Sequence, residues 1–216
     1  MNSIRLLIVD DNFIARRGLR SFLETQPDMF VAGEASTGFE ALDMARTTNV
    51  DVVLLDIRMP RMDGITATRE LLKICPECKL LILTVLDEPS FLAKALLAGA
   101  VGYLIYGRFT PEDLVRSIRK VKIGETAFIP AVPPLLLRIL KKIPEPSGSY
   151  ENSNALTSRE LEILKYIVLG DNNLEIAKEL AIEEKTVKNH INNIYSKLGV
   201  TSRQDAIWLV TRKTIT

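Results

Sequence analysis

Polar side chains, among them three carboxylates that could hold a metal ion, follow three apolar, strand-like runs of the sequence. Asp10 and Asp11 follow the first run, Asp56 follows the second and Thr84 follows the third. One aspartate at such a place is often only a helix N-cap. Three carboxylates that meet in one crevice repel one another, and a divalent cation such as Mg²⁺, which prefers hard oxygen ligands, relieves that repulsion. The spacing therefore predicts a magnesium site.

The elements that would position this site alternate between strand and helix across residues 4–124. Five such units, closed by a helix over Pro111–Val121, predict a parallel, doubly wound sheet. A ligand site in such a sheet lies beyond the carboxyl ends of the strands. Residues expected at those ends are Asp10, Asp11, Asp56, Thr84 and Tyr106. The predicted strands are Ile4–Val9, Phe30–Glu34, Val52–Leu55, Leu80–Leu83 and Gly102–Ile105.

A second candidate site lies in the run from Glu183 to Val200. Its apolar residues repeat with the period of an α-helix. Its other face offers cations that suit phosphate groups and amides that suit base edges of DNA. An ordinary surface helix would show the same pattern. The apolar residues are Val187, Ile191, Ile194 and Leu198, and the polar ones are Lys185, Lys188, Asn189, Asn192 and Ser196.

The elements around this helix favour the DNA-binding interpretation. Thr157 and Glu160 form a capping box that begins a helix ending at Gly170. A short helix over Leu174–Leu180 follows, and the brief connection to the polar helix predicts a helix-turn-helix. A last helix is expected from about Arg203 to Arg212.

Length and composition favour two domains in 216 residues. We expect a first domain over residues 1–124, a linker over 125–154 and a second domain over 155–216. The linker is rich in Pro, Ser, Gly and Asn from Pro144 to Asn154, and Leu135–Ile143 is compatible with a short helix.

The location expected for the protein is the cytoplasm, without a membrane partner. No signal peptide is visible, and no apolar run approaches the roughly 18 residues needed to span a bilayer. The two cysteines, Cys75 and Cys78, form a C-x-x-C. One histidine is too few to complete a zinc site, and chance spacing is favoured over a redox pair.

The charge distribution bears on DNA binding. The whole chain carries a net charge of +1, and residues 150–216 hold nine basic and nine acidic residues. Affinity for DNA must therefore come from one local face rather than from a global field, which favours binding as a dimer.

Residues 1–124 resemble the response-regulator receiver domain. The matching motifs are V-D-D-N at 9–12, L-L-D-I-R-M-P-R-M-D-G at 54–64, I-L-T at 82–84 and G-A-V-G-Y-L at 99–104. The resemblance implies a five-stranded sheet of order 2-1-3-4-5 and a sensor histidine kinase as partner. It also implies Asp56 as phosphoacceptor and Thr84 and Tyr103 as switch residues. Asp11, Asp56 and the Arg58 backbone carbonyl would bind Mg²⁺, with Asp10 assisting through water.

Residues 156–207 resemble the LuxR-type (NarL/FixJ) helix-turn-helix. The motifs are L-T-S-R-E-L-E-I-L, N-L-E-I-A-K-E-L and K-T-V-K-N-H-I-N-N-I-Y-S-K-L-G-V. The resemblance implies an all-α domain that binds an operator with two half-sites as a homodimer, with Val210 and neighbouring positions of the last helix as candidate dimer contacts. We expect Lys188, Asn189 and Asn192 to read bases. Residues better placed for phosphate are Lys185, Thr186, Lys197 and Arg203.

One residue departs from the receiver pattern. Tyr106 stands where the family places a lysine after G-Y-L-x, and a phenol brings a hydrogen-bond donor but no charge. Arg58 or Arg108 could supply a cation from another position. The sequence therefore predicts a transcription regulator, not an enzyme, that is controlled by phosphorylation of Asp56. The alternatives are a regulator that binds DNA independently of phosphorylation and a magnesium-dependent phosphohydrolase.

Overall fold

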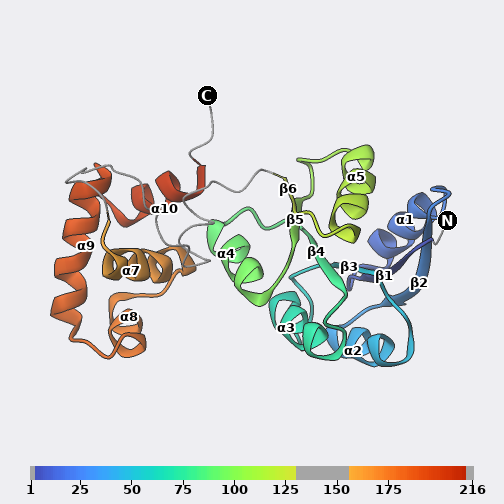
Figure 1. Ribbon diagram of the computed structural model, residues 1–216, viewed down its shortest axis with the longest axis horizontal. Helices are drawn as coiled ribbons and strands as arrows, with labels where there is room; N and C mark the ends of the chain where they lie inside the picture. Colours follow the sequence, from blue (N-terminus) through green and yellow to red (C-terminus); the bar gives the residue numbers. More distant parts are fainter. Residues whose placement is uncertain (1–2, 130–155, 213–216) are drawn as a thin grey trace. The chain divides into compact units, whose positions relative to one another are not determined.

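The computed structural model describes residues 3–129 and 156–212, which lie in two compact units (Figure 1). The first contains a parallel sheet covered by helices, and the second contains helices alone. The predicted helix over Leu135–Ile143 and the Pro144–Asn154 segment fall outside the described residues. No helix in the described part of the chain is long and apolar enough to cross a membrane.

The sheet of the first unit has the order β2-β1-β3-β4-β5-β6, and each neighbouring pair is parallel. The predicted doubly wound class and the order of the first five strands are confirmed. The strands are β1 (Ile4–Val9), β2 (Met29–Ala35), β3 (Val52–Leu55), β4 (Lys79–Thr84), β5 (Gly102–Ile105) and β6 (Ala127–Ile129). The helices are α1 (Phe13–Leu23), α2 (Gly38–Thr47), α3 (Gly64–Ile74), α4 (Pro89–Ala98) and α5 (Pro111–Lys122).

Strand β6 corrects the expectation of five strands, because it lies in the segment predicted to be linker. Its first residue, Ala127, pairs with Gly102 of β5. A Cβ atom on Gly102 would lie 2.8 Å from the Ala127 carbonyl oxygen, so the absence of a side chain lets the two strands approach. A strand of three residues has too little alternation to be predicted from sequence.

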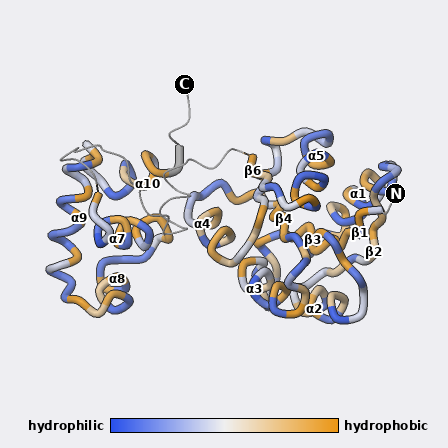
Figure 2. The backbone as a smooth tube through the Cα atoms, in the orientation of Figure 1, coloured by the Kyte–Doolittle hydropathy of each residue, from blue (hydrophilic) through white to orange (hydrophobic). Residues whose placement is uncertain are grey.

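The core of this unit lies on both faces of the sheet. Alternate strand residues pack against α1 and α5 on one face, and Leu6, Leu54 and Leu104 are fully buried there with Ile118 of α5. Helices α2 and α3 cover the other face (Figure 1). Figure 2 shows apolar residues concentrated along the strands and mixed with hydrophilic ones on the helices. Because both faces are covered, the ends of the strands are the places where polar side chains gather.

The second unit contains α7 (Ser158–Leu169), α8 (Asn173–Glu179), α9 (Glu184–Leu198) and α10 (Arg203–Arg212). The predicted capping box begins α7, with Thr157 and Glu160 each accepting a hydrogen bond from the other's backbone N–H. Helices α7 and α9 end at glycines in the left-handed conformation, Gly170 and Gly199. Helices α8 and α9 form the expected helix-turn-helix, and the apolar stripe of α9 is buried at Val187, Ile191 and Ile194.

Candidate functional sites

The three aspartates expected to bind a metal ion meet at the carboxyl ends of β1 and β3. Carboxylate oxygens of Asp10, Asp11 and Asp56 all lie within 4.8 Å of one another. Asp10 is only 6% exposed, Asp56 is half-buried and Asp11 is exposed. The cluster thus offers oxygen ligands on its buried side and is open to solvent at Asp11. This suits a divalent cation that also binds water.

Burial and mutual repulsion make negative charge costly in this acidic cluster. Burial raises the pKa of Asp10, and the charges of Asp56 and Asp11 raise it further. Burial likewise raises the pKa of Asp56, although backbone N–H groups of Ile57 and Arg58 and the Thr84 hydroxyl act in the opposite direction. A cation that binds among these carboxylates therefore stabilises the cluster.

The loop after β3 holds Asp56 in place. The backbone N–H of Arg58, whose carbonyl is an expected ligand, donates to Asp56 Oδ2 at 3.2 Å. Asp63 caps α3 by accepting from the N–H groups of Ile65 and Thr66, both at 2.9 Å. A Cβ atom on Gly64 would lie 2.1 Å from the Asp56 carbonyl oxygen. Only glycine fits that place, which explains the Asp-Gly pair at the end of the motif.

Tyr106 lies close to the acidic cluster without a hydrogen bond. Its hydroxyl is buried and has no partner among the described residues. Burial raises its pKa, and the charges of Asp10 and Asp56 raise it further, so the phenol stays protonated. Its ring packs beside Phe109, with 5.6 Å between the ring centroids. The structure thus places an unused donor, rather than a cation, at this edge of the sheet.

A guanidinium that the sequence did not suggest, that of Arg16 of α1, lies beside Asp10. Its Nη1 donates to the Asp10 carbonyl oxygen at 2.5 Å, and its charge lowers the pKa of Asp10. Arg108, one of the two expected substitutes for the lysine, is instead paired with Asp87. Arg58, the other, has an exposed side chain. A basic residue in the first turn of the helix after Asp11 was the only sequence signal for Arg16.

The two expected switch residues contact the same residue of the β4–α4 connection. Thr84 is fully buried, and its hydroxyl accepts from the Leu86 N–H at 3.3 Å. Tyr103 is buried, and its hydroxyl donates to the Leu86 carbonyl at 2.9 Å. Thr84 and Tyr103 are therefore linked through the backbone of Leu86.

Helix α9 exposes most of the polar face expected to contact DNA. Lys185, Lys188, Asn189 and Asn192 are exposed, and Thr186 is half-buried. Lys188 forms an ion pair of 2.8 Å with Glu184. Both side chains are largely exposed, so this pair costs little to exchange for a contact with DNA.

Two residues expected to contact phosphate are engaged inside the domain. Lys197 donates to Glu160 at 2.7 Å, and the carboxylate of Glu160 is almost fully buried. Arg203 donates to the carbonyl of Asp171 and to Asn173 Oδ1. These contacts join α9 to α7 and α10 to the start of α8. Lys197 and Arg203 would therefore have to leave these partners in order to make the predicted phosphate contacts.

Val210, one of the α10 positions expected to contact a second copy, is fully buried, so the expectation is wrong for this residue, and the neighbouring positions remain a prediction. The periodicity of α10 suited a core position equally well. The large apolar side chain that α10 exposes is Trp208, which is 56% exposed.

Comparison with known protein families agrees with both parts of this structure. Residues 6–119 match the response regulator receiver domain, and residues 154–210 match the luxR family of bacterial regulatory proteins. A chain that joins these two domains is a transcriptional response regulator, not an enzyme, which removes the phosphohydrolase alternative.

Relatives and solved structures cover nearly the whole chain. It is 39% identical to the uncharacterized transcriptional regulatory protein YhcZ of Bacillus subtilis, over 94% of this chain and 93% of that protein. It is 38% identical to the response regulator protein VraR of Staphylococcus aureus, over 95% of each. The structure of the two-component response regulator RcsB–DNA complex matches with a TM-score of 0.57 and 25% identity, over 99% of this chain and 100% of that one. The chain therefore belongs to the response regulators that join a receiver domain to a LuxR-type helix-turn-helix, and it is a DNA-binding transcription regulator of a two-component system.

Proposed function

We propose that Asp56 is the phosphoacceptor and that a phosphohistidine of a sensor kinase supplies the phosphoryl group. The observation that carries this proposal is the meeting of three carboxylates within 4.8 Å at the carboxyl ends of β1 and β3. In the transfer, an oxygen of Asp56 bonds to phosphorus as the bond from phosphorus to the imidazole nitrogen breaks. The histidine keeps that electron pair and takes a proton from solvent.

The acidic cluster fits Mg²⁺. Asp11, Asp56 and the backbone carbonyl of Arg58 would hold the ion, with Asp10 assisting through a water molecule. When bound, the ion offsets the negative charge that develops on the phosphoryl oxygens. The protein contributes the Arg58 N–H that orients Asp56 and the close approach at Gly64 that keeps the loop in place.

Phosphorylation would act through the β4–α4 connection. A phosphoryl oxygen on Asp56 would accept a hydrogen bond from the hydroxyl of Thr84, which is buried at the end of the neighbouring strand. Movement of that hydroxyl toward the phosphoryl group would displace Leu86, whose N–H donates to the Thr84 oxygen. Movement of Leu86 would in turn change the acceptor that holds Tyr103. This connection is the element whose two states the phosphoryl group would bias.

The polar face of α9 would enter the major groove. Asn189 and Asn192 suit adenine, and Lys188 suits guanine. Lys185 and Thr186 would contact phosphates, and contacts by Lys197 and Arg203 would require exchange with their partners inside the domain. A neutral domain with so few contacts would bind two half-sites about one helical turn apart as a homodimer. Because its target is chromosomal DNA, we place the regulator in the cytoplasm.

A phosphorylation-independent mode is the second candidate, and Tyr106 is the observation that favours it. The uncharged hydroxyl near Asp10 and Asp56 cannot replace the electrostatic attraction of a lysine for a phosphoryl group. A ligand shifts an equilibrium only by its differential interaction with the two states. Phosphorylation should then change DNA affinity by less than the typical coupling of about 1–3 kcal/mol.

Phosphorylation can be measured directly. The full chain is incubated with a small phosphodonor and Mg²⁺, and intact mass is recorded for wild type and Asp56→Asn. We expect one phosphoryl group on wild type and none on the variant. Absence of incorporation at high donor and Mg²⁺ would assign the protein to the phosphorylation-independent mode.

The coupling experiment uses a duplex selected from a random-sequence pool by the protein itself. Its affinity is measured with and without phosphodonor for wild type and Tyr106→Lys. We expect a small response in wild type and a larger one in the variant. A wild-type response of about a hundredfold that disappears in Asp56→Asn would show that another group, such as Arg16, replaces the lysine.

The DNA face is tested on the same duplex. Lys188→Ala and Asn192→Ala should each weaken binding by roughly 1–3 kcal/mol and relax the base preference, because each removes a base contact. Gln204→Ala, an exposed amide on α10, is the matched control and should leave affinity unchanged. Unchanged base preference in both α9 variants would contradict the assignment of this face.

A further inference from the structure

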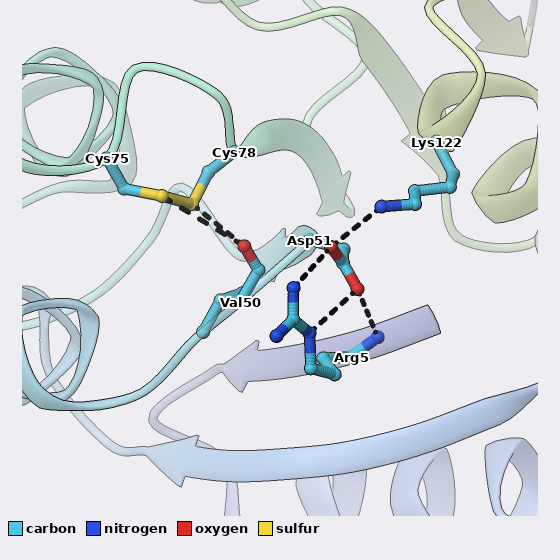
Figure 3. The surroundings of a disulfide bond; sticks show 6 residues. All are labelled: Arg5, Val50, Asp51, Cys75, Cys78 and Lys122. Atoms are coloured by element: carbon cyan, nitrogen blue, oxygen red, sulfur yellow. Dashed lines mark hydrogen bonds and ion pairs between the residues drawn. A yellow bond between two sulfur atoms is a disulfide. The ribbon is translucent and has the colours of Figure 1, made fainter. Parts of the chain in front are cut away.

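The two cysteines occupy the turn that connects α3 to β4, at the amino ends of the strands. Cys75 is the C-cap residue of α3, and Cys78 immediately precedes β4. The Cys78 N–H donates to the Cys75 carbonyl at 3.1 Å, which closes the turn. Their Cα atoms are 5.4 Å apart, and their sulfurs are joined in a disulfide (Figure 3). The backbone therefore holds the pair at a separation that a disulfide accepts.

The two sulfurs differ in access. The Cys78 side chain is 2% exposed, whereas Cys75 is only half-buried and is followed by the exposed Pro76 and Glu77. Thiol–disulfide exchange requires the incoming sulfur to reach its target directly. A small thiol or disulfide can therefore attack at Cys75 but not at Cys78.

The backbone carbonyl of Val50 faces both sulfurs (Figure 3). It lies 3.2 Å from Cys78 Sγ and 4.0 Å from Cys75 Sγ. In the dithiol form, the Cys78 S–H can donate to this carbonyl, and in the disulfide form the covalent bond replaces that donor. Each state thus has a stabilising interaction of its own.

The acceptor stays in place in both states because the next residue is strongly anchored. Asp51 accepts from the backbone N–H and the guanidinium of Arg5 and from Lys122 Nζ, at distances of 2.7 to 3.1 Å. None of these contacts involves a cysteine. Opening the disulfide would therefore leave these contacts of Asp51 in place.

We propose that Cys75 and Cys78 form a reversible dithiol–disulfide site whose reaction partners are low-molecular-weight disulfides and thiols. In oxidation, the Cys75 thiolate attacks the disulfide, forms a mixed disulfide and releases one thiolate. The Cys78 thiolate then attacks the Cys75 sulfur, closes the ring and releases the second thiolate. The protein loses two protons and two electrons, and the small disulfide is reduced to two thiols. Disulfides of cytosolic proteins are usually of this transient kind.

The site is separate from the acidic cluster, because the cysteines lie at the opposite ends of the strands. The disulfide precedes β4, whereas Thr84 is the last residue of that strand. The proposal therefore does not depend on phosphorylation of Asp56.

The first experiment follows the state of the pair in the full-length wild type. The protein is equilibrated in buffers of increasing oxidised-to-reduced glutathione ratio, quenched with acid, alkylated and weighed. We expect the number of alkylated thiols to fall from two to zero together, in a monomer that has lost two hydrogen atoms. Two free thiols at the most oxidised ratio, or only disulfide-linked dimers, would overturn the proposal.

The second experiment separates the roles of the cysteines. Cys78→Ser should accumulate one glutathione on Cys75, whereas Cys75→Ser should remain unmodified, and the double variant is the blank. Limited alkylation of reduced wild type should label Cys75 first, which tests the same asymmetry without substitution. Equal labelling of the two cysteines would overturn the assignment of Cys75 as the exchanging sulfur.

Discussion

The pKa values of carboxylates are shifted in opposite directions at the two ends of the receiver strands. At the carboxyl ends, Asp10 and Asp56 lie beside another acid, and burial raises the pKa of both. At the amino ends, hydrogen bonds from Arg5, followed by those from Lys122, hold the pKa of Asp51 well below its ordinary value. One end therefore leaves negative charge available for a ligand, and the other uses it to fix the fold.

The helical domain contains a second carboxylate of the compensated kind. Burial raises the pKa of Glu160, but hydrogen bonds from Lys197 and from Thr157 more than offset this effect, and its pKa is lowered. The comparison teaches that burial alone does not mark a functional acid. The distinguishing feature is whether the surrounding residues supply the counter-charge or leave it to a ligand.

The largest effect is expected for Asp51→Ala, which removes the anchor between β1, β3 and α5. The free energy of unfolding should fall by about 2–3 kcal/mol at pH 7. The expected loss is smaller than for a fully buried pair because the Arg5 and Lys122 side chains are about 40% exposed. Urea unfolding measures it, and Asp43→Ala, at an exposed pair with Arg46, is the control that should change little.

The difference in stability between wild type and Asp51→Ala should also depend on pH. A carboxylate with a lowered pKa stabilises the folded state above its unfolded pKa of about 4 and loses that contribution as pH falls through the folded value. The stability difference between wild type and Asp51→Ala should therefore narrow below pH 4. A difference that is constant from pH 7 to pH 3 would show that the contribution of Asp51 is not electrostatic.

A somewhat smaller loss, about 1–2 kcal/mol, is expected for Glu160→Ala. The substitution removes half of the α7 capping box and leaves the ammonium of Lys197 without this acceptor. Lys197→Ala should also lower the melting temperature, which a residue that only contacts DNA would not do. If Lys197→Ala weakens DNA binding at unchanged stability, the predicted phosphate contact is its main role.

In the acidic cluster at the carboxyl ends of the strands, removing a carboxylate should raise the free energy of unfolding rather than lower it. Asp10→Asn removes one of three close negative charges, so the free energy of unfolding without Mg²⁺ should rise by about 1 kcal/mol. The same variant should gain less stability than wild type when Mg²⁺ is added, because a ligand stabilises the folded state according to its affinity. A loss of stability in Asp10→Asn without Mg²⁺ would contradict the proposed repulsion.

The smallest effect is expected for Tyr106→Phe. Its hydroxyl has no hydrogen-bond partner among the described residues, so its removal should leave stability unchanged or raise it by up to about 1 kcal/mol. Thermal unfolding without phosphodonor measures the change. A clear loss of stability would indicate that the hydroxyl is hydrogen-bonded in solution.

The acidic cluster could be predicted almost entirely from sequence. Strands that alternate with helices form a parallel sheet, and Asp10, Asp11 and Asp56 follow strands whose carboxyl ends meet at one edge of it. Arg16 could not, because its position depends on how the first turn of α1 folds back over the end of β1. Likewise, periodicity identified the exposed face of α9 but did not reveal that Lys197 and Arg203 have partners on α7 and near α8.

By itself, the sequence determined the alternation of strands and helices, the helix-turn-helix and the residues at the strand ends, because these follow from local periodicity and capping. The order of the first five strands came from the resemblance to the receiver family. Only the tertiary structure decided which cations pair with the carboxylates of Asp51 and of Glu160, which lie in different domains. It also decided the burial of Val210, the addition of β6 and the disulfide between Cys75 and Cys78. The physical reason is that a polar or apolar side chain has several local conformations of similar energy. Its partner and its burial are set by residues far away in sequence that the fold brings to it.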